Sequence, residues 1–422
     1  MISLAVRAGL SPGFSPTPPD DSAIEEVVTA EAGLRPPAHV TLRVTPLVEE
    51  DACVPRGAPV ACLRDAPDIC LVAPMPARVA RITLQPGRKL TEIVLFHDEG
   101  GGVQRHDVSG SSRPAGLRAL MQRAGLWPWL RRRPFGGMPA VDEVPAAILV
   151  MAVDTRPAAP DPLVAIAGRE ESFERGLRAL KRLTEGPVLV CHAAGREDAI
   201  PAMGVRVQPV PVGPRHPQGA AGIRLHEAWP AGLDAPVWDL HAEDVAALGR
   251  LLETGTLPMN RLVSVAGPAL RAPRLVRTQP GASLRGLSFH DLHPGAHVLL
   301  SGDPLGGHPA EWLAPRDRQV SALSRPEAAA PPHWLIRALT RSARPRPVIP
   351  TAALDQAFGA QIPAAAFVRA LSAGDDEMAM KLGALSLLEE DVALADYVLG
   401  GEADLQGMLR VMLDRIRTEF AA

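Results

Sequence analysis

The chain has 422 residues, of which 46% are hydrophobic and 22% are charged, so it can bury several cores and is not generally disordered. Its 44 prolines and 37 glycines favour many turns and short elements, and they exclude a coiled-coil rod. The formal net charge is −3, so the surface as a whole is not basic and no nucleic acid is expected as a partner.

Several classes of protein are excluded by motifs that the sequence lacks. Its lysines are Lys89, Lys181 and Lys381, and none follows the glycine-rich turn of a P-loop. The longest apolar run, residues 144–153, has about half the length of a membrane-spanning helix, and the N-terminus does not resemble a secretory signal. The sequence has no G-x-G-x-x-G dinucleotide fingerprint, and its four cysteines lack metal-site spacing. We therefore predict a cytoplasmic chain without a metal site and without catalytic residues of its own.

Residues 1–110 are predicted to form an N-terminal β domain resembling a barrel-sandwich. Apolar and polar residues alternate at 77–84, as in a half-buried strand. The segments 55–60 and 73–79 are typical of the two halves of such a fold. A covalent carrier domain of this kind needs a lysine at the turn between the halves, and residues 65–68 offer none. A carrier function is therefore excluded.

Residues 111–257 are predicted to form a central α/β domain of Rossmann-like type. Apolar runs at 146–153 and 188–191 alternate with amphipathic stretches at 171–183 and 243–252. This alternation of strands and helices is typical of a largely parallel sheet.

The remaining chain is predicted to hold a small module and a helical end. Residues 258–325 return to β character and predict a β-grasp-like (SLBB-like) module. Residues 326–422 combine a proline- and arginine-rich linker with a C-terminal helical domain, in which apolar stripes within 367–416 predict three helices. The predicted fold class is therefore a multidomain α+β protein.

The run Arg131, Arg132 and Arg133 is the most conspicuous charge feature of the sequence. Guanidinium groups ahead of a Pro-Phe-Gly-Gly turn can bind an anion, a headgroup or a carboxylate of a partner through paired hydrogen bonds. The alternative interpretation is a solvated face with no ligand. Both interpretations stay open at the level of sequence.

A second candidate site follows the strand predicted at 146–153. Asp154, Arg169 and Glu170 lie in the loop and at the helix start beyond this strand. Ligands of open α/β sheets bind beyond the carboxyl ends of the strands, so a site is expected here. Glu170 can equally serve only to cap the following helix.

Long strings, in order along residues 120–420, resemble one family. They are GLWPWLRRRPF at 125–135, MAVDTRP at 151–157, AGREESF at 167–173, PRLVRT at 273–278, LSAGD at 371–375 and EEDVAL at 389–394. These strings resemble the A subunits of the sodium-translocating NADH:quinone oxidoreductases (Na⁺-NQR). That family is similar in turn to the C subunit of the Rnf complex and to the flavin-carrying subunit of complex I.

The resemblance implies a peripheral subunit on the cytoplasmic face of the bacterial inner membrane. The complex couples NADH oxidation and ubiquinone reduction to Na⁺ export. Its integral-membrane and flavin-carrying subunits are the expected partners, and they are expected to hold its FAD, FMN and iron–sulfur centres. Members of this family carry no redox cofactor themselves and are associated with quinone binding. Ubiquinone is therefore a candidate ligand.

If quinone contacts this chain, we expect an apolar cleft lined by Trp127, Trp129 and Phe135 near the arginines, because a quinone pocket needs apolar walls and a donor for the carbonyl oxygens.

The glycine-rich nucleotide loop of the flavin-carrying relatives corresponds here to residues 131–137. Arg-Pro-Phe replaces most of its glycines, so backbone amides cannot approach a phosphate closely.

Two alternative functions stay open. One is a soluble NADH- or flavin-binding electron-transfer subunit of the complex I or Rnf type. The other is a divergent scaffold paralogue, because residues 65–68 and Ala77 depart from the family pattern in the N-terminal domain. The missing glycines and the absence of C-terminal cysteines favour the redox-silent subunit over the flavin-binding one.

Overall fold

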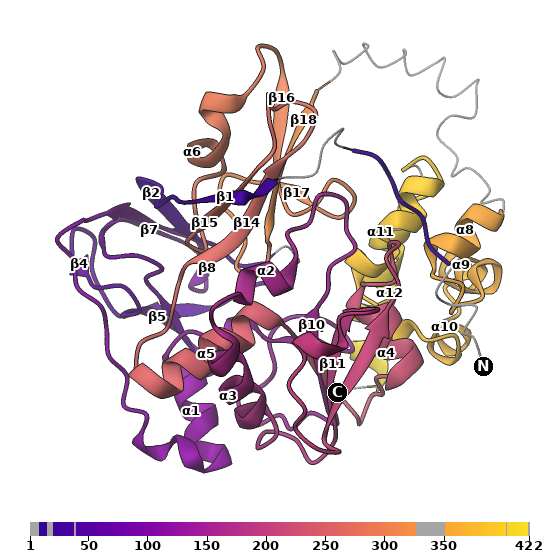
Figure 1. Ribbon diagram of the computed structural model, residues 1–422, viewed down its shortest axis with the longest axis horizontal. Helices are drawn as coiled ribbons and strands as arrows, with labels where there is room; N and C mark the ends of the chain where they lie inside the picture. The colour runs from indigo at the N-terminus through magenta and orange to yellow at the C-terminus, as the bar shows by residue number, and fades with distance from the viewer. Residues whose placement is uncertain (1–7, 15–19, 38, 326–350, 402, 421–422) are drawn as a thin grey trace.

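The computed structural model describes residues 8–14, 20–37, 39–325, 351–401 and 403–420. Two small N-terminal sheets lie on one side of the molecule and the C-terminal helices lie on the other, with an α/β unit between them (Figure 1). A further sheet projects from the α/β unit. Among the described residues, none of the helices has the length and apolar character needed to cross a bilayer.

The N-terminal part consists of two antiparallel sheets that share one core. The first has the strand order β2-β8-β7-β4 and the second has the order β3-β5-β6. Their core is built from buried apolar residues such as Val60, Val79, Ile93 and Leu95. The strands are β2 (Glu31–Leu34), β3 (Val44–Pro46), β4 (Cys53–Val54), β5 (Pro59–Leu63), β6 (Cys70–Val72), β7 (Ala77–Gln85) and β8 (Lys89–His97). The strand predicted at 77–84 is confirmed as β7.

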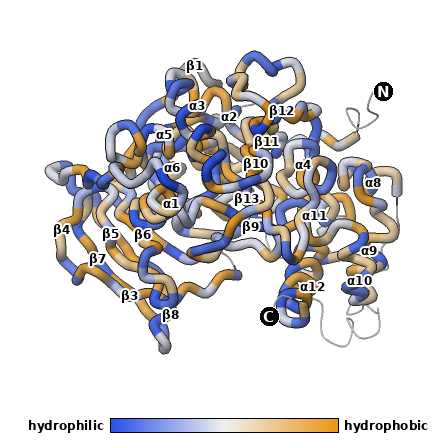
Figure 2. The backbone as a smooth tube through the Cα atoms, turned by 90° about the horizontal axis from the view of Figure 1, so that it is seen from below, coloured by the Kyte–Doolittle hydropathy of each residue, from blue (hydrophilic) through white to orange (hydrophobic). Residues whose placement is uncertain are grey.

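The central unit is a five-stranded sheet with the order β12-β11-β10-β13-β9. Neighbours from β12 to β13 are parallel, whereas β9 pairs antiparallel with β13. Its strands are β9 (Arg131–Arg133), β10 (Ala147–Ala152), β11 (Val188–Ala193), β12 (Val207–Val212) and β13 (Val237–His241). All six residues of β10 are buried, as expected for a strand covered on both faces. The strands at the centre of the molecule are accordingly hydrophobic in Figure 2.

Helices cover both faces of this sheet. One face packs on α1 (Pro114–Arg123), α3 (Glu170–Leu180) and α5 (Ala242–Thr254), and the other face packs on α4 (Ala221–Ala228). The short helix α2 (Pro162–Ile166) lies beside α5. The contact of α3 with α5 depends on glycines, since a Cβ atom at Gly249 would lie 1.7 Å from the Ser172 carbonyl oxygen. The helices predicted at 171–183 and 243–252 are confirmed as α3 and α5.

The third sheet has the order β1-β15-β14-β18-β16-β17. Its strands are β1 (Asp20–Glu26), β14 (Arg261–Ala266), β15 (Arg274–Thr278), β16 (His297–Ser301), β17 (His308–Pro309) and β18 (Gln319–Ser324), and the helix α6 (Leu284–Ser288) packs on its core. Strand β1 comes from the N-terminal segment and pairs in parallel with β15. The sequence gives no signal of this long-range pairing.

The C-terminal part is helical, as its apolar stripes predict. Within the predicted range the described residues form four α-helices and not three, because the middle stripe is interrupted at Gly383, which has a positive φ angle, and a separate helix follows at 389–398. A fifth helix precedes this range. The helices are α8 (Ala352–Ala357), α9 (Ala364–Ala373), α10 (Asp376–Lys381), α11 (Glu389–Val398) and α12 (Leu405–Phe420). Their shared core includes Phe358, Phe367 and Leu394. The linker predicted from residue 326 lies outside the described residues up to residue 350.

Candidate functional site

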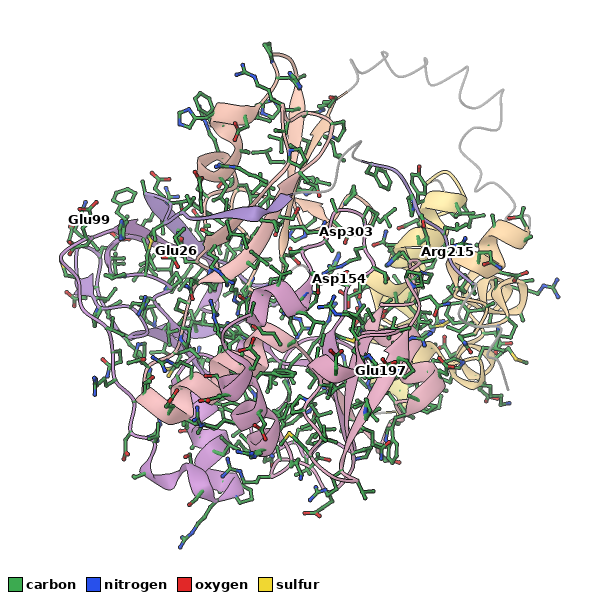
Figure 3. All side chains as sticks on the ribbon, in the orientation of Figure 1. Glu26, Glu99, Asp154, Glu197, Arg215 and Asp303 are labelled. Carbon is green, nitrogen blue, oxygen red and sulfur yellow. The ribbon has the colours of Figure 1, made fainter. Side chains whose placement is uncertain are left out.

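The sheet order places a crevice where α/β proteins bind their ligands. The chain runs from β10 outward to β11 and β12 and then returns to β13 on the other side of β10. The carboxyl ends of β10 and β13 therefore form a topological switch point. Asp154 follows β10, and His241 is the last residue of β13. Asp303, from the loop after β16, lies close to Asp154 near the centre of the molecule (Figure 3).

An arginine of β9 lies buried beneath this crevice. Arg133 is fully buried, with an exposed fraction of 0%. Its Nε lies 3.2 Å from Oδ2 of Asp239 in β13. Its two terminal nitrogens reach α11, with Nη1 at 2.6 Å from Oδ2 of Asp391 and Nη2 at 3.1 Å from Oε1 of Glu390. One guanidinium thus joins the sheet to the C-terminal helices.

Three further arginines complete this ion-pair network. Arg131 pairs with Glu390, and Arg316 pairs with Asp239. Arg156 donates from Nε to Oδ1 of Asp154 at 3.0 Å and lies 3.6 Å from Oδ2 of Asp303. Four guanidinium groups therefore face five carboxylates, and the arginines are neutralised inside the protein.

The charges of α11 are held in place by this network. Asp391 accepts hydrogen bonds from Arg133, from the Gly222 backbone at 2.8 Å and from the Leu388 backbone at 2.8 Å. Burial raises the pKa of Asp391, and Glu390 raises it further, whereas Arg133 and the two backbone N–H groups favour the carboxylate form because all three are donors. Burial by itself raises the pKa of Glu390, but Arg131 and Arg133 outweigh burial and lower that pKa to about 2. Glu390 therefore carries negative charge at neutral pH.

The network leaves little room for a ligand in the crevice. The remaining cavity has a volume of about 90 Å³ and is lined by residues including Arg131, Asp154, Arg156, His241 and Glu390. Sites for cofactors and small molecules usually have volumes of roughly 300–1,000 Å³. The crevice is therefore filled by side chains of the protein itself. Among the described residues, no group of His, Cys, Asp or Glu side chains is arranged to hold a metal ion.

Two histidines border the crevice, the buried His216 and the half-buried His241. Burial lowers the pKa of His216 to about 4, and burial together with Arg318 lowers the pKa of His241 to about 3. His241 is the N-cap of α5, and its Nδ1 accepts a hydrogen bond of 3.1 Å from the Glu243 backbone. This acceptor role requires the neutral imidazole, which agrees with the low pKa.

Replacing His241 with asparagine should weaken the pH dependence of stability. The unfolded imidazole titrates near about pH 6.5, whereas the folded one does so at about 3, so the unfolded state binds more protons between these values. Stability is therefore lost as the pH falls through this window. His241→Asn keeps the cap and should reduce the slope by up to about 1.4 kcal/mol per pH unit. Urea unfolding at about pH 7 and about pH 4 measures this change, with the exposed His290→Asn as control. An unchanged slope in His241→Asn would contradict the prediction.

The aromatic candidates lie in hydrophobic cores. Trp127 is fully buried, donates its indole N–H to the Pro139 carbonyl at 2.9 Å and packs edge-on against Trp238 at 5.3 Å. Trp129 is buried beneath the Arg261 guanidinium, 3.9 Å from its ring centroid. Phe135 is buried in the core of the C-terminal helices. The structure thus distributes the three rings over two cores, and they do not form a common cleft.

The charged candidates fall into separate places. Arg131 and Asp154 line the crevice, and Arg133 lies beneath it, so the interpretation of the arginine run as a solvated face is wrong. Arg132 pairs at 2.8 Å with Glu143 and points away from the network. Arg169 and Glu170 lie at the start of α3, away from Asp154. The Glu170 carboxylate accepts the Gly168 N–H at 2.9 Å, as its capping alternative predicts.

Except for Asp154, the acidic residues of the network are not predicted by the sequence. Asp239, Glu390 and Asp391 are separated from Arg133 by 106 to 258 residues along the chain. Asp303 pairs instead with Arg156. One signal was available, since the acidic run at 389–391 complements the basic run at 131–133.

A groove lies on the other side of Arg131. Its cavity of about 330 Å³ runs between β9, the turn at 306–308 and α12. The lining includes apolar Pro128, Leu130 and Met138 and the polar groups of His308, Gln406 and Arg410. A neighbouring cavity of about 310 Å³ shares Pro37, Val40 and His308 with it. We call the first cavity the Arg131 groove.

The fold and the crevice define a multidomain protein built on an open α/β sheet whose ligand crevice is closed by its own ion pairs. Residues 112–257 match the family model described as the NqrA second alpha/beta domain, and residues 262–311 match the NQRA C-terminal domain. The chain is 34% identical over 410 residues to the A subunit of the Na(+)-translocating NADH-quinone reductase of Teredinibacter turnerae, covering 90% of this chain and 91% of the relative. The chain belongs to the family of these A subunits.

Other relatives carry the same name. The relative from Pasteurella multocida is 31% identical over 450 residues, covering 99% of this chain and 100% of the relative. That from Pseudomonas aeruginosa is 37% identical over 331 residues, covering 72% of this chain and 74% of the relative. A solved NAD⁺-reducing [NiFe]-hydrogenase structure aligns with 14% identity and a TM-score of 0.40, covering 72% of this chain and 64% of that chain. This last similarity is too low to support an inference.

Proposed function

We propose that the chain is a peripheral subunit on the cytoplasmic face of a Na⁺-translocating NADH:quinone reductase and holds no redox cofactor itself. Its partners would be the integral-membrane and flavin-carrying subunits, whose FAD, FMN and iron–sulfur centres would carry electrons from NADH to ubiquinone. The filled crevice is the observation that carries this proposal. A flavin or NADH placed there would have to displace Arg133, Arg156 and their buried carboxylates.

The filled crevice also argues against the flavin-binding alternative. Separating a buried ion pair leaves uncompensated charges and costs about 3–5 kcal/mol. The Arg131–Arg133 segment adds a second obstacle, because it forms β9 and its backbone pairs with β13. Its amides are therefore not arranged as a loop around a phosphate. A scaffold paralogue without a pump is the remaining alternative, and partner analysis separates it from the proposal.

Co-purification tests this function directly. A tagged chain should be isolated from gently solubilised native membranes, its partners identified by mass spectrometry and its flavin content read from the absorption spectrum. We expect integral-membrane redox subunits to co-purify, and we expect the chain isolated alone to show no flavin absorbance. Recovery only from the soluble fraction, or with a flavin of its own, would contradict the proposal.

The Arg131 groove is the place we propose for a quinone headgroup on this chain. Pro128, Leu130 and Met138 supply apolar walls, and His308, Gln406 and Arg410 supply donors for carbonyl oxygens. This position keeps the quinone beside the arginines, as the sequence predicts, while the buried rings of Trp127, Trp129 and Phe135 act as support for the segment. The volume of about 330 Å³ is at the lower end for a small-molecule site.

Filling the groove should abolish quinone labelling. Gln406 lies in the first turn of α12, and its backbone N–H is bound by Asp396, so the helix start tolerates a larger side chain. Gln406→Trp should lower labelling by a quinone photoprobe at least about fivefold, because the indole occupies the space between the walls. Val411→Trp on an exposed position of the same helix is the control. Equal labelling of both variants would rule out the groove.

A further inference from the structure

We propose that the outer tip of the third sheet binds an anionic bilayer surface, an inference that rests on the peripheral placement proposed above. This basic tip lies where β16 begins and β18 ends, at the projecting end of the sheet (Figure 1). It is defined by the exposed residues Arg271, Arg285, Phe289, His290, His293, His297 and Arg325.

Backbone hydrogen bonds bring the segments of the basic tip together. The Arg271 N–H donates to the Asp291 carbonyl at 2.8 Å, and the His293 N–H donates to the Ala269 carbonyl at 2.8 Å. The Arg325 N–H donates to the Ala296 carbonyl at 2.9 Å, beside His297. The exposed residues therefore come from the loop that holds Arg271, from α6 and the segment that leads into β16, and from the end of β18, and hydrogen bonds join these segments at one end of the sheet.

The arginines of the basic tip retain their charge for a partner. Arg271, Arg285 and Arg325 make no ion pair with any residue in the described ranges. Of the carboxylates nearby, Glu25 and Asp291 pair with Arg274, which lies 3.1 Å from Oε2 of Glu25 and 3.4 Å from Oδ2 of Asp291. The exposed Glu311, whose carbonyl accepts the Leu284 N–H, makes no ion pair with a described residue and offsets one of the three arginine charges. The positive charge is local, because the chain as a whole has a net charge of −3.

An exposed aromatic ring accompanies these charges. Phe289 is 54% exposed, and the Arg285 guanidinium lies 5.0 Å from its ring centroid. The exposed imidazoles of His290, His293 and His297 add hydrogen-bonding groups around it. A bilayer interface accepts both kinds of group, since the ring enters the boundary between headgroups and acyl chains while the arginines bind phosphate groups. A single-stranded nucleic acid also stacks its bases on exposed rings, so an oligonucleotide serves as the competitor in the experiment.

Vesicle flotation of the full chain tests the proposal. We expect binding to vesicles of phosphatidylcholine with phosphatidylglycerol, weak binding to phosphatidylcholine alone and release at high salt. Each basic residue near an anionic surface contributes about fivefold, so the double variant Arg271→Glu, Arg285→Glu should lower the partition coefficient at least about 25-fold. Phe289→Ser should lower it about tenfold.

The control carries the same change of charge elsewhere. Arg105 and Arg113 are exposed, lie outside the basic tip and make no ion pair with described residues, so Arg105→Glu, Arg113→Glu should bind as the unchanged protein does. An equal loss in this control, or no preference for anionic vesicles, would overturn the proposal. Displacement from the vesicles by a single-stranded oligonucleotide would also overturn it and assign the tip to nucleic acid.

The two proposals fail in distinguishable ways. If the unchanged chain co-purifies with the redox subunits but does not bind anionic vesicles, only the inference about the basic tip is wrong. If it binds the vesicles but has no redox partners in native membranes, the pump assignment is wrong.

Discussion

Replacing Arg133 with leucine should lower the free energy of unfolding by about 3–5 kcal/mol. The substitution leaves Asp391 fully buried without its cation, whereas Asp239 keeps its ion pair with Arg316. The penalty arises from the uncompensated Asp391 carboxylate and not from the loss of a favourable pair as such. Urea unfolding followed by circular dichroism measures the difference.

Arg250→Leu is the matched control for this prediction. Arg250 pairs with Glu253 at 2.9 Å on the exposed face of α5, where an ion pair contributes no more than about 1 kcal/mol. A loss in Arg133→Leu no larger than in Arg250→Leu would mean that water reaches Asp391. In that case the crevice would be open and the argument against a bound nucleotide would weaken.

Replacing Trp127 with alanine should lower stability by about 3–5 kcal/mol without a specific effect on quinone. The ring is fully buried, and its removal leaves a cavity beside Trp238 and an unpaired carbonyl at Pro139. Thermal unfolding measures the loss of stability. Quinone photolabelling, carried out below the temperature of the unfolding transition, measures the effect on quinone binding.

Trp229→Ala provides the comparison, because this ring is 39% exposed and its removal should cost far less. If Trp127→Ala abolished photolabelling while stability stayed unchanged, Trp127 would line a ligand site. The apolar cleft predicted from the sequence would then be correct, and the Arg131 groove would not be the site.

The ion pairs give the crevice a structural role in place of a binding role. An open α/β sheet commonly binds its ligand at the switch point, with backbone amides and a few polar side chains. Here Arg133 and Glu390 occupy that position and connect the sheet to α11. We therefore expect partners at the surface of the protein, at the proposed Arg131 groove and basic tip.

The arginine run illustrates how far the sequence alone can lead. Its charge and its position before the Pro-Phe-Gly-Gly turn leave open an anion, a headgroup or a carboxylate of a partner as its ligand, or a solvated face with no ligand. The structure supplies those carboxylates from β13 and α11 of the same chain, with β9 as the element that presents the arginines. Strand pairing and the alternation of side chains between the two faces of the sheet decide which arginine of the run is buried. A short, wholly polar strand does not reveal this register in its sequence.

The sequence by itself determined the family, because long strings of residues match it in order. It also determined the alternation of strands and helices between residues 111 and 257 and the helical character of the C-terminal part, because local apolar periodicity carries this information. The tertiary structure alone decided that β1 joins β15, that Trp127 and Phe135 lie in different cores, and that Asp391 closes the crevice onto Arg133. These features depend on contacts between residues far apart in the chain. The free energy of such contacts comes from burial and charge neutralisation in the assembled fold, so no local sequence pattern predicts them.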